Sequence, residues 1–160
     1  GVTTPLNVTL TLPPPQYARQ GGEIVAAQLA KVGIVAKIEN VEWAQWLSGP
    51  FKGNFDLTII NHVEPLDYAT AYADPNYYFG YDSARFRGFV ATLAATTDQR
   101  EKARLWRDIQ RQLAEDAVNA FIWNPAQVAV FKRGLRGLWN SSPIFANDMA
   151  AVSWAPAART

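Results

Sequence analysis

The chain has 160 residues, of which 49% are hydrophobic and 18% charged, and its formal net charge is +1. It contains no cysteine, which excludes disulfide bonds, thiolate metal sites and thiol nucleophiles. The near-neutral charge, with arginines spread over several segments, argues against a nucleic-acid-binding surface. No apolar run approaches the roughly 20 residues that span a bilayer. The length predicts a single domain over residues 1–160.

The chain opens with a strand pattern followed by a helix pattern. "NVTLTL", residues 7–12, alternates with a period of two and is rich in β-branched residues, and "PPP" ends it. A helix is predicted over residues 17–32. Val25, Leu29 and Val32 share one of its faces, and Gly33 is a natural stop.

Two further strands complete the predicted sheet. Residues 34–43 form the first, and a short helix or turn, "WAQWLSG", follows it. The second, residues 55–60, reads "FDLTII", the nearly continuous apolar pattern of a strand buried on both faces. The alternation of strands and helices predicts an α/β unit with parallel pairing and helices packed on the sheet.

The second half of the chain is predicted to be mainly helical. Residues 83–95 carry apolar side chains at helical spacing, and a second helix runs to about residue 117. Asp98 followed by Glu101 resembles a capping box at the start of this helix. "AFIWNPAQVAVF", residues 120–131, is predicted to be a strand broken at its Asn-Pro step, or two short strands. The tail from about residue 134 is predicted to be irregular.

The loop "INHVEPLDYATAYADPNYYFGYD", residues 60–82, has an unusual composition. It holds the only histidine, five of the six tyrosines and four carboxylates, without a lysine or arginine. It follows a predicted strand at the end where open α/β sheets usually bind ligands. Rings and carboxylates together suit an ammonium group, and they equally suit a hydroxyl-rich solute. We therefore predict ligand binding in this loop.

Catalytic patterns are lacking in the sequence. One histidine and no cysteine leave too few ligands for zinc. There is no G-x-S-x-G elbow, no phosphate-binding loop and no G-x-G-x-x-G sequence. Glu64 and Asp67 lie three residues apart in a loop, which defines no glycosidase geometry. We predict a protein that is not an enzyme and that needs neither a metal nor a cofactor.

Several motifs, taken together, resemble the oligopeptide/dipeptide-binding family, the periplasmic solute-binding proteins that serve peptide-type ABC importers. They are "VTLTLP", "QLAKVGI" with "VEW", "GNFDLTIINHVEPLD" and the helix pattern D-x-x-x-R-x-x-L-W-x-x-x-Q. The resemblance covers about residues 8–123, and more loosely extends to 154. It implies the C-terminal lobe of a two-lobed, venus-flytrap fold, with a mixed, mostly parallel sheet flanked by helices.

The resemblance also implies a function and partners. A member of this family captures a peptide or other small polar solute outside the cytoplasm and delivers it to a membrane permease. On this view the N-terminal lobe and the signal peptide belong to a longer parent chain, and the parent is periplasmic. The start at Gly1 and the single methionine, Met149, fit that expectation.

The resemblance finally suggests ligand-binding residues. In relatives the segment matching "FDLTIINHVEPLD" lines the cleft, an acidic residue there holds the peptide's amino group, and the tryptophan of "VEW" faces the ligand. "NHVEPLD" departs from the peptide binders, so the amine anchor is Glu64 or Asp67 or is absent, and sugars, nickel complexes and opines stay open as ligands. The candidate ligand-binding set is Trp43, Asn61, His62, Glu64, Asp67, Tyr68, Tyr77 and Tyr78.

One rival function belongs to a different class. An exposed loop rich in aromatic and acidic residues could make this chain a stand-alone interaction domain that docks a protein partner, because contiguous apolar patches mark such sites. A glycoside-active enzyme is a remote third option.

Overall fold

The computed structural model describes residues 5–63, 67–124, 126, 128–140 and 146–156. Strands and helices alternate in the first part: β1 (Leu6–Leu12), α1 (Gln16–Ala30), β2 (Ile34–Asn40), α2 (Trp43–Ser48), a 3-10 turn (Pro50–Lys52) and β3 (Leu57–Thr58). Helices follow: α3 (Asp67–Thr70), α4 (Ala84–Ala95) and α5 (Gln99–Glu115). The tail contains β4 (Leu135–Arg136), a second 3-10 turn (Met149–Ala151) and β5 (Ser153–Trp154).

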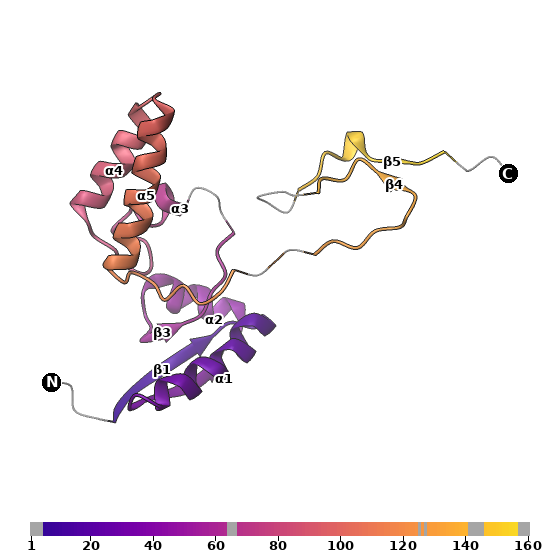
Figure 1. Cartoon of the computed structure of the whole chain (residues 1–160). Helices are drawn as coiled ribbons and strands as arrows, with labels where there is room; N and C mark the ends of the chain where they lie inside the picture. The colour runs from indigo at the N-terminus through magenta and orange to yellow at the C-terminus, as the bar shows by residue number, and fades with distance from the viewer. Residues whose placement is uncertain (1–4, 64–66, 125, 127, 141–145, 157–160) are drawn as a thin grey trace.

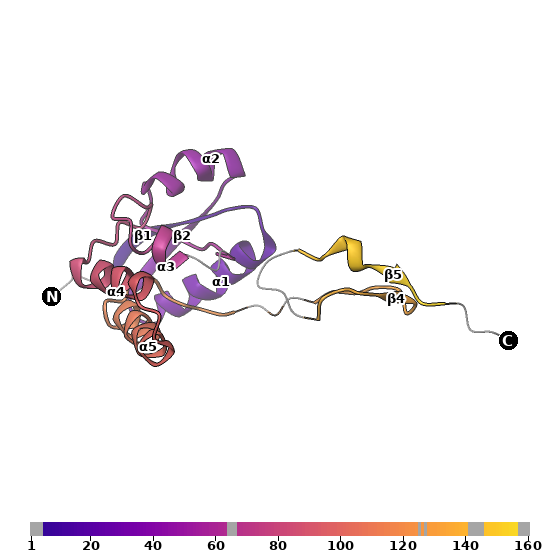
Figure 2. The same cartoon turned by 90° about the horizontal axis from the view of Figure 1, so that it is seen from above.

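The first three strands form a parallel sheet in the order β2-β1-β3. β1 lies in the centre and pairs with β2 along its whole length, from Leu6 opposite Ile34 to Leu12 opposite Asn40. Its central place buries Leu10 and Leu12. Figure 2 shows α1 and α2 on opposite sides of the strands. The α/β class and the parallel pairing expected from the sequence are therefore confirmed.

α1 approaches the sheet most closely through small residues, and Val25 of the predicted apolar face packs against the same core. Ala18, Gly21 and Gly22 are the buried residues of this helix, whereas Val32 is exposed beyond its end. A Cβ atom on Gly22 would lie 2.3 Å from a methyl carbon of Leu12, so only glycine permits this approach. The predicted stop at Gly33 is confirmed by its φ of 81°.

β3 is shorter and less buried than the sequence predicts. Its two residues pair only with β1, as an edge strand, and both are half-buried. The Asp56 carboxylate accepts a hydrogen bond from Thr9 N at 2.8 Å, which satisfies a β1 donor just before the pairing begins. Trp46 of α2 is 3% exposed, and its indole N–H donates to the Thr58 hydroxyl at 3.0 Å. This bond fixes α2 on β3.

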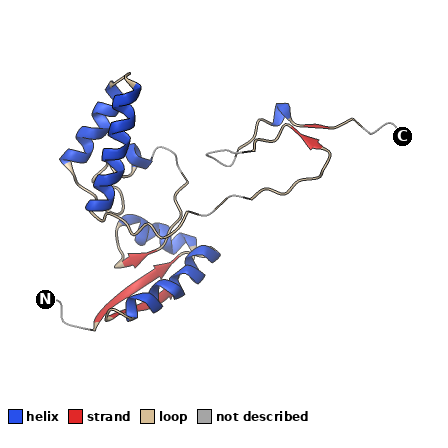
Figure 3. Ribbon diagram, viewed as in Figure 1, coloured by secondary structure: helices blue, strands red, loops and turns tan. Residues whose placement is uncertain are grey.

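α4 and α5 form a helical hairpin with a core of its own (Figure 3). The Ser83 hydroxyl caps α4 by accepting from Phe86 N, and Asp98 caps α5 by accepting from Arg100 N and Glu101 N. The Glu101 side chain pairs with Arg104. The buried residues of this core are Phe86, Leu93, Leu105, Ile109 and Leu113.

The strand predicted at residues 120–131 is wrong for the described part of that segment, which has no regular secondary structure. Val128 and Val130 are 84% and 94% exposed, so no neighbouring strand covers them. In Figures 1 and 2 the β4 and β5 region extends away from the sheet and the hairpin. The tail, predicted to be irregular, contains a two-residue antiparallel ladder with Leu135 opposite Trp154.

Candidate functional site

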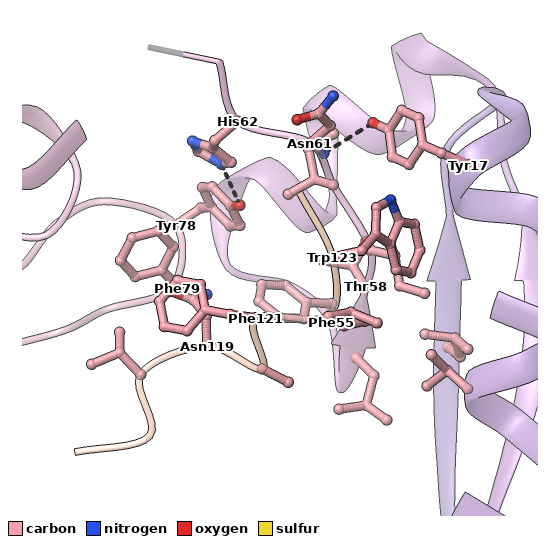
Figure 4. Close-up of a pocket in the computed structure, with 18 of the residues that line it drawn as sticks. Tyr17, Phe55, Thr58, Asn61, His62, Tyr78, Phe79, Asn119, Phe121 and Trp123 are labelled. Carbon is pink, nitrogen blue, oxygen red and sulfur yellow. Dashed lines mark hydrogen bonds between the residues drawn. The ribbon is translucent and has the colours of Figure 1, made fainter. Parts of the chain in front are cut away.

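A groove of about 960 Å³ lies where the sheet, the aromatic loop and the segment after α5 meet. The sheet and α1 contribute Leu10, Tyr17, Val25 and Leu29. The remaining walls come from residues 55–62, from Asp67, Tyr72, Tyr78 and Phe79, and from residues 118–124 (Figure 4). The groove thus runs along β3, from Phe55 and Asp56 before the strand to Asn61 and His62 beyond its carboxyl end, the end at which a parallel sheet presents its ligand-binding loops.

Three polar side chains form a hydrogen-bonded chain in the wall of the groove. His62 Nδ1 lies 2.9 Å from Asp67 Oδ2, and His62 Nε2 lies 2.9 Å from the Tyr78 hydroxyl. Only 18% of the Asp67 side chain and 26% of the His62 side chain are exposed. Asp67 begins α3, so a short helix holds the carboxylate against the imidazole.

Burial keeps the Tyr78 hydroxyl in its protonated form. Desolvation is the main cause that raises the pKa of Tyr78 well above that of a free tyrosine, and the neighbouring Tyr77, Tyr72 and Asp67 raise it further. The hydroxyl therefore retains a hydrogen to donate.

The start of the loop is held by a second tyrosine. The backbone N–H of Asn61 donates to the Tyr17 hydroxyl at 3.1 Å, which joins the residues after β3 to α1. Figure 4 shows this bond and the bond between His62 and Tyr78 within the same groove.

An aromatic cluster supports the groove from the side of α2. Tyr78 lies with its ring centroid 5.3 Å from that of Phe51 and 5.9 Å from that of Trp46. Tyr77 and Phe79 pack on Tyr78, with centroids 5.0 and 5.1 Å away. The loop tyrosines are thus half-buried among other rings, because each finds an edge or a face to pack against.

The ligand-binding residues predicted from the sequence do not all lie in the groove. Asn61, His62, Asp67 and Tyr78 line the groove, and Tyr77 packs beside them. Glu64 lies outside the described residues.

Two candidates lie elsewhere. Trp43 is 42% exposed on α2 and packs edge-on against Trp46, 5.8 Å between centroids. Tyr68 packs on Trp106, 4.5 Å between centroids, as part of the helical hairpin's surroundings. Tyr68 is not among the residues that line the groove, and its ring packs on Trp106 of α5.

The sequence reasoning missed the wall that follows α5. Asn119, Phe121 and Trp123 line the groove, although a strand is predicted from residue 120 onward. The Trp123 ring lies against α1 at Gly21, where an added Cβ would come within 2.5 Å of its Cη2 atom. The Asn119 side-chain oxygen is buried and has no hydrogen-bond partner. The aromatic content of "AFIW" is the only local signal that could have indicated this wall.

The charge of the groove is negative. Asp56 and Asp67 line it, and the described lining residues include neither lysine nor arginine. Over the described ranges, no three His, Asp or Glu side chains come together as a metal site. No helix in those ranges has the length and apolarity needed to cross a membrane.

The arrangement of a parallel sheet and flanking helices corresponds to part of the fold of two solved binding proteins, one of them an ABC transporter-associated periplasmic binding protein. The oligopeptide-binding protein AppA from Bacillus subtilis, solved with a nonapeptide, matches with a TM-score of 0.60 and 20% identity, over 71% of this chain and 24% of AppA. The periplasmic binding protein DppA from Helicobacter pylori, solved with the peptide STSA, matches with a TM-score of 0.58 and 21% identity, over 72% of this chain and 25% of DppA.

This chain spans about a quarter of the length of either structure, and at these identities the match establishes the fold alone. No protein-family model and no curated protein matches the sequence.

Proposed function

We propose that this chain is one lobe of the substrate-binding component of an ABC importer and that its groove captures a peptide or another small polar solute. The observation that carries the proposal is the groove that runs along β3 and past its carboxyl end, with rings and two carboxylates in its walls. Such a groove combines apolar surface with a few fixed polar groups, as small-molecule sites do.

The likeness to two peptide-bound proteins supports the same function. In this proposal a second lobe of a longer protein closes over the groove, and the loaded protein delivers its solute to a membrane permease. The parent is exported to the periplasm. The chain captures its ligand without transforming it, and its sequence contains no G-x-S-x-G elbow.

The test is a titration of this chain with STSA and, separately, with a nonapeptide. Two-dimensional NMR spectra monitor binding through changes in the amide chemical shifts. Shifts should concentrate in residues 55–62 and 118–124. Phe79→Ala, in the groove, should weaken binding, whereas Phe131→Ala, in the tail, should leave it unchanged. Equal effects of the two variants, or shifts confined to the tail, would overturn the proposal.

The rival function has less support. Docking a protein through an exposed aromatic loop requires free ring faces, but Tyr72, Tyr77 and Tyr78 are half-buried against other rings. A partner protein would find less apolar surface on this loop than the sequence suggests.

A further inference from the structure

We propose that the C-terminal arm of this chain, residues 128–156, binds the surface of an anionic lipid bilayer. The arm lies outside the groove, so this inference goes beyond the proposed function and is tested separately from it. Figures 1 and 2 show the arm extending away from the sheet and the helical hairpin.

The large apolar side chains of the arm are exposed. Six of them have between 50% and 94% of their surface accessible to solvent: Val128, Val130, Phe131, Trp139, Met149 and Trp154. Neither of the two hydrophobic cores in the described chain includes a residue of the arm. Concentrated exposed apolar surface marks sites that bind proteins or membranes, so we expect the arm to meet a partner.

The arm is basic, whereas the rest of the chain is acidic. From residue 132 onward the sequence has four lysines and arginines and one acid, but residues 1–131 have eleven basic residues and thirteen acids. Lys132, Arg133 and Arg136 are exposed, and within the described residues no ion pair joins them to a carboxylate. A local excess of positive charge without acidic partners favours an anionic surface.

The ladder of β4 and β5 separates apolar from basic side chains. Leu135 lies opposite Trp154, and Arg136 lies opposite Ser153. Residues directly opposite each other point to the same face of a ladder, and successive residues point to opposite faces. One face of this ladder therefore carries Leu135 and Trp154, and the other carries Arg136. An element with an apolar face and a basic face suits the boundary between lipid and water.

Local contacts hold the arm in a defined shape without a core. The backbone N–H of Trp139 donates to the Asn147 side-chain oxygen at 2.8 Å, and that of Ala155 donates to the Gly134 carbonyl oxygen at 2.7 Å. Gly137 has a φ of 85° and lies against the carbonyl group of Ala151, where a Cβ atom would not fit. The arm therefore presents its rings from a folded ladder.

A bilayer fits these features better than a folded protein does. Tryptophan is enriched at the membrane–water interface, because its ring is apolar and its N–H is polar. Long lysine and arginine side chains reach anionic headgroups while their apolar neighbours enter the lipid. A protein interface requires a closely fitting surface, but the exposed apolar side chains here are spread along an extended arm (Figure 1).

The experiment measures co-sedimentation of the chain with sucrose-filled vesicles of phosphatidylcholine, with and without added phosphatidylglycerol. Each basic residue near an anionic surface raises the affinity roughly fivefold, so the anionic vesicles should bind at least about tenfold more tightly than the neutral ones. This preference should shrink between about 0.1 M and about 1 M salt, because the screening length falls from about 10 Å to about 3 Å.

A triple variant tests the basic residues of the arm. It combines Lys132→Gln, Arg133→Gln and Arg136→Gln. A matched control makes the same change of charge at three exposed arginines of α5: Arg100→Gln, Arg107→Gln and Arg111→Gln. The arm variant should lose the preference for anionic vesicles, and the α5 variant should keep most of it.

A single variant tests the apolar contribution. Trp139→Ala should weaken binding to the anionic vesicles several-fold, because it removes an exposed ring of the arm. Ile24→Ala, which removes an exposed apolar side chain of α1, should leave binding unchanged. Melting temperatures of all variants report whether each one folds.

Three results would show that the proposal is wrong: equal binding to both kinds of vesicle, an equal loss in the two triple variants, or unchanged binding of Trp139→Ala. If neither kind of vesicle binds the chain, the bilayer is excluded as the partner, and the exposed side chains of the arm are left for a protein surface. None of these results affects the titration of the groove with STSA, so the proposed function stands or fails separately.

Discussion

Two tryptophans three residues apart have different roles on α2. Resemblance to solute-binding proteins directs attention to Trp43, which is 42% exposed. Trp46 is the buried one, and its indole N–H reaches Thr58, whose hydroxyl in turn donates to the carbonyl oxygen of Thr11 at 2.7 Å. A single residue therefore ties α2 to two strands of the sheet.

Because the two tryptophans differ in burial, replacing each one with alanine should lower the free energy of unfolding by different amounts. Trp46→Ala should lower the free energy of unfolding by about 3–5 kcal/mol, because it empties a buried site. Trp43→Ala should cost less than about 1 kcal/mol, because much of its ring already contacts water. Denaturant unfolding of both variants measures the two costs. Similar values would show that α2 does not depend on the contact with Thr58.

A second prediction at this scale concerns acid and the Tyr81–Asp116 pair. The Tyr81 hydroxyl donates to Asp116 at 2.6 Å, and this bond, helped by Gln112, lowers the pKa of Asp116 below that of a free aspartate. Because the pKa of Asp116 is lower in the folded than in the unfolded state, its ionised carboxylate stabilises the fold at pH values above the ordinary pKa of a carboxyl group. This contribution to the free energy of unfolding disappears as the pH falls through the folded-state pKa. Tyr81→Phe should therefore reduce stability at pH 6 and make it less sensitive to acid below about pH 4. Unfolding midpoints from pH 6 to pH 3 test this, and parallel pH profiles would contradict it.

At the scale of elements, the segment after α5 differs most from expectation. Its apolar residues suggest a sheet strand, yet the structure uses Trp123 to attach the segment to Gly21 of α1. Phe121 and Asn119 thereby come to line the groove. The segment is a wall of the site rather than a member of the sheet.

Glycine-to-alanine changes in two helices test this attachment. Gly88 in α4 has open space where a Cβ would lie, so Gly88→Ala should raise the free energy of unfolding by about 0.5–1 kcal/mol. Gly21→Ala should lack that gain, because its Cβ would lie 2.5 Å from the Trp123 ring and displace it. It should also change tryptophan emission and weaken STSA binding in the groove. An equal gain in both variants, with unchanged emission, would show that Trp123 is not held there.

At the scale of the whole molecule, the chain has two cores with the groove at their junction. One core packs Leu10, Leu12, Ala18 and Ile59 between the sheet and α1, and the other lies in the helical hairpin. Residues 60–82 connect the two units along the chain. The groove's lining includes Tyr72 and Val118, which pack against the hairpin core, but no residue of α4 or α5.

The last prediction compares this chain with the longer protein proposed to contain it. Binding sites for small molecules bury most of the ligand surface, and in the proposed two-lobed protein a second lobe supplies part of that burial. We expect this chain to fold alone but to bind STSA far more weakly than the longer protein. Calorimetric titration of both with the same peptide gives the comparison. Equal affinities would rule out a contribution from a second lobe.

The sequence by itself determined most of the local elements and indicated the loop that contributes to the candidate site. Two-residue alternation predicts β1, helical spacing predicts α1, α4 and α5, and side-chain acceptors at Ser83 and Asp98 mark where two of these helices begin. The composition of residues 60–82 identified the loop that holds His62, Asp67 and Tyr78. These features are readable because they depend on neighbours within a few residues of each other.

Only the tertiary structure decided which of these side chains meet. Three sets of contacts join residues from separate elements. They are the hydrogen bonds of His62 to Asp67 and Tyr78, the packing of Tyr68 on Trp106 and the packing of Trp123 at Gly21. No periodicity encodes such contacts, because they depend on how the units pack against one another. The same reason explains the wrong strand at residues 120–131: an apolar segment pairs as a strand only where a free sheet edge lies beside it, and local sequence does not specify that edge.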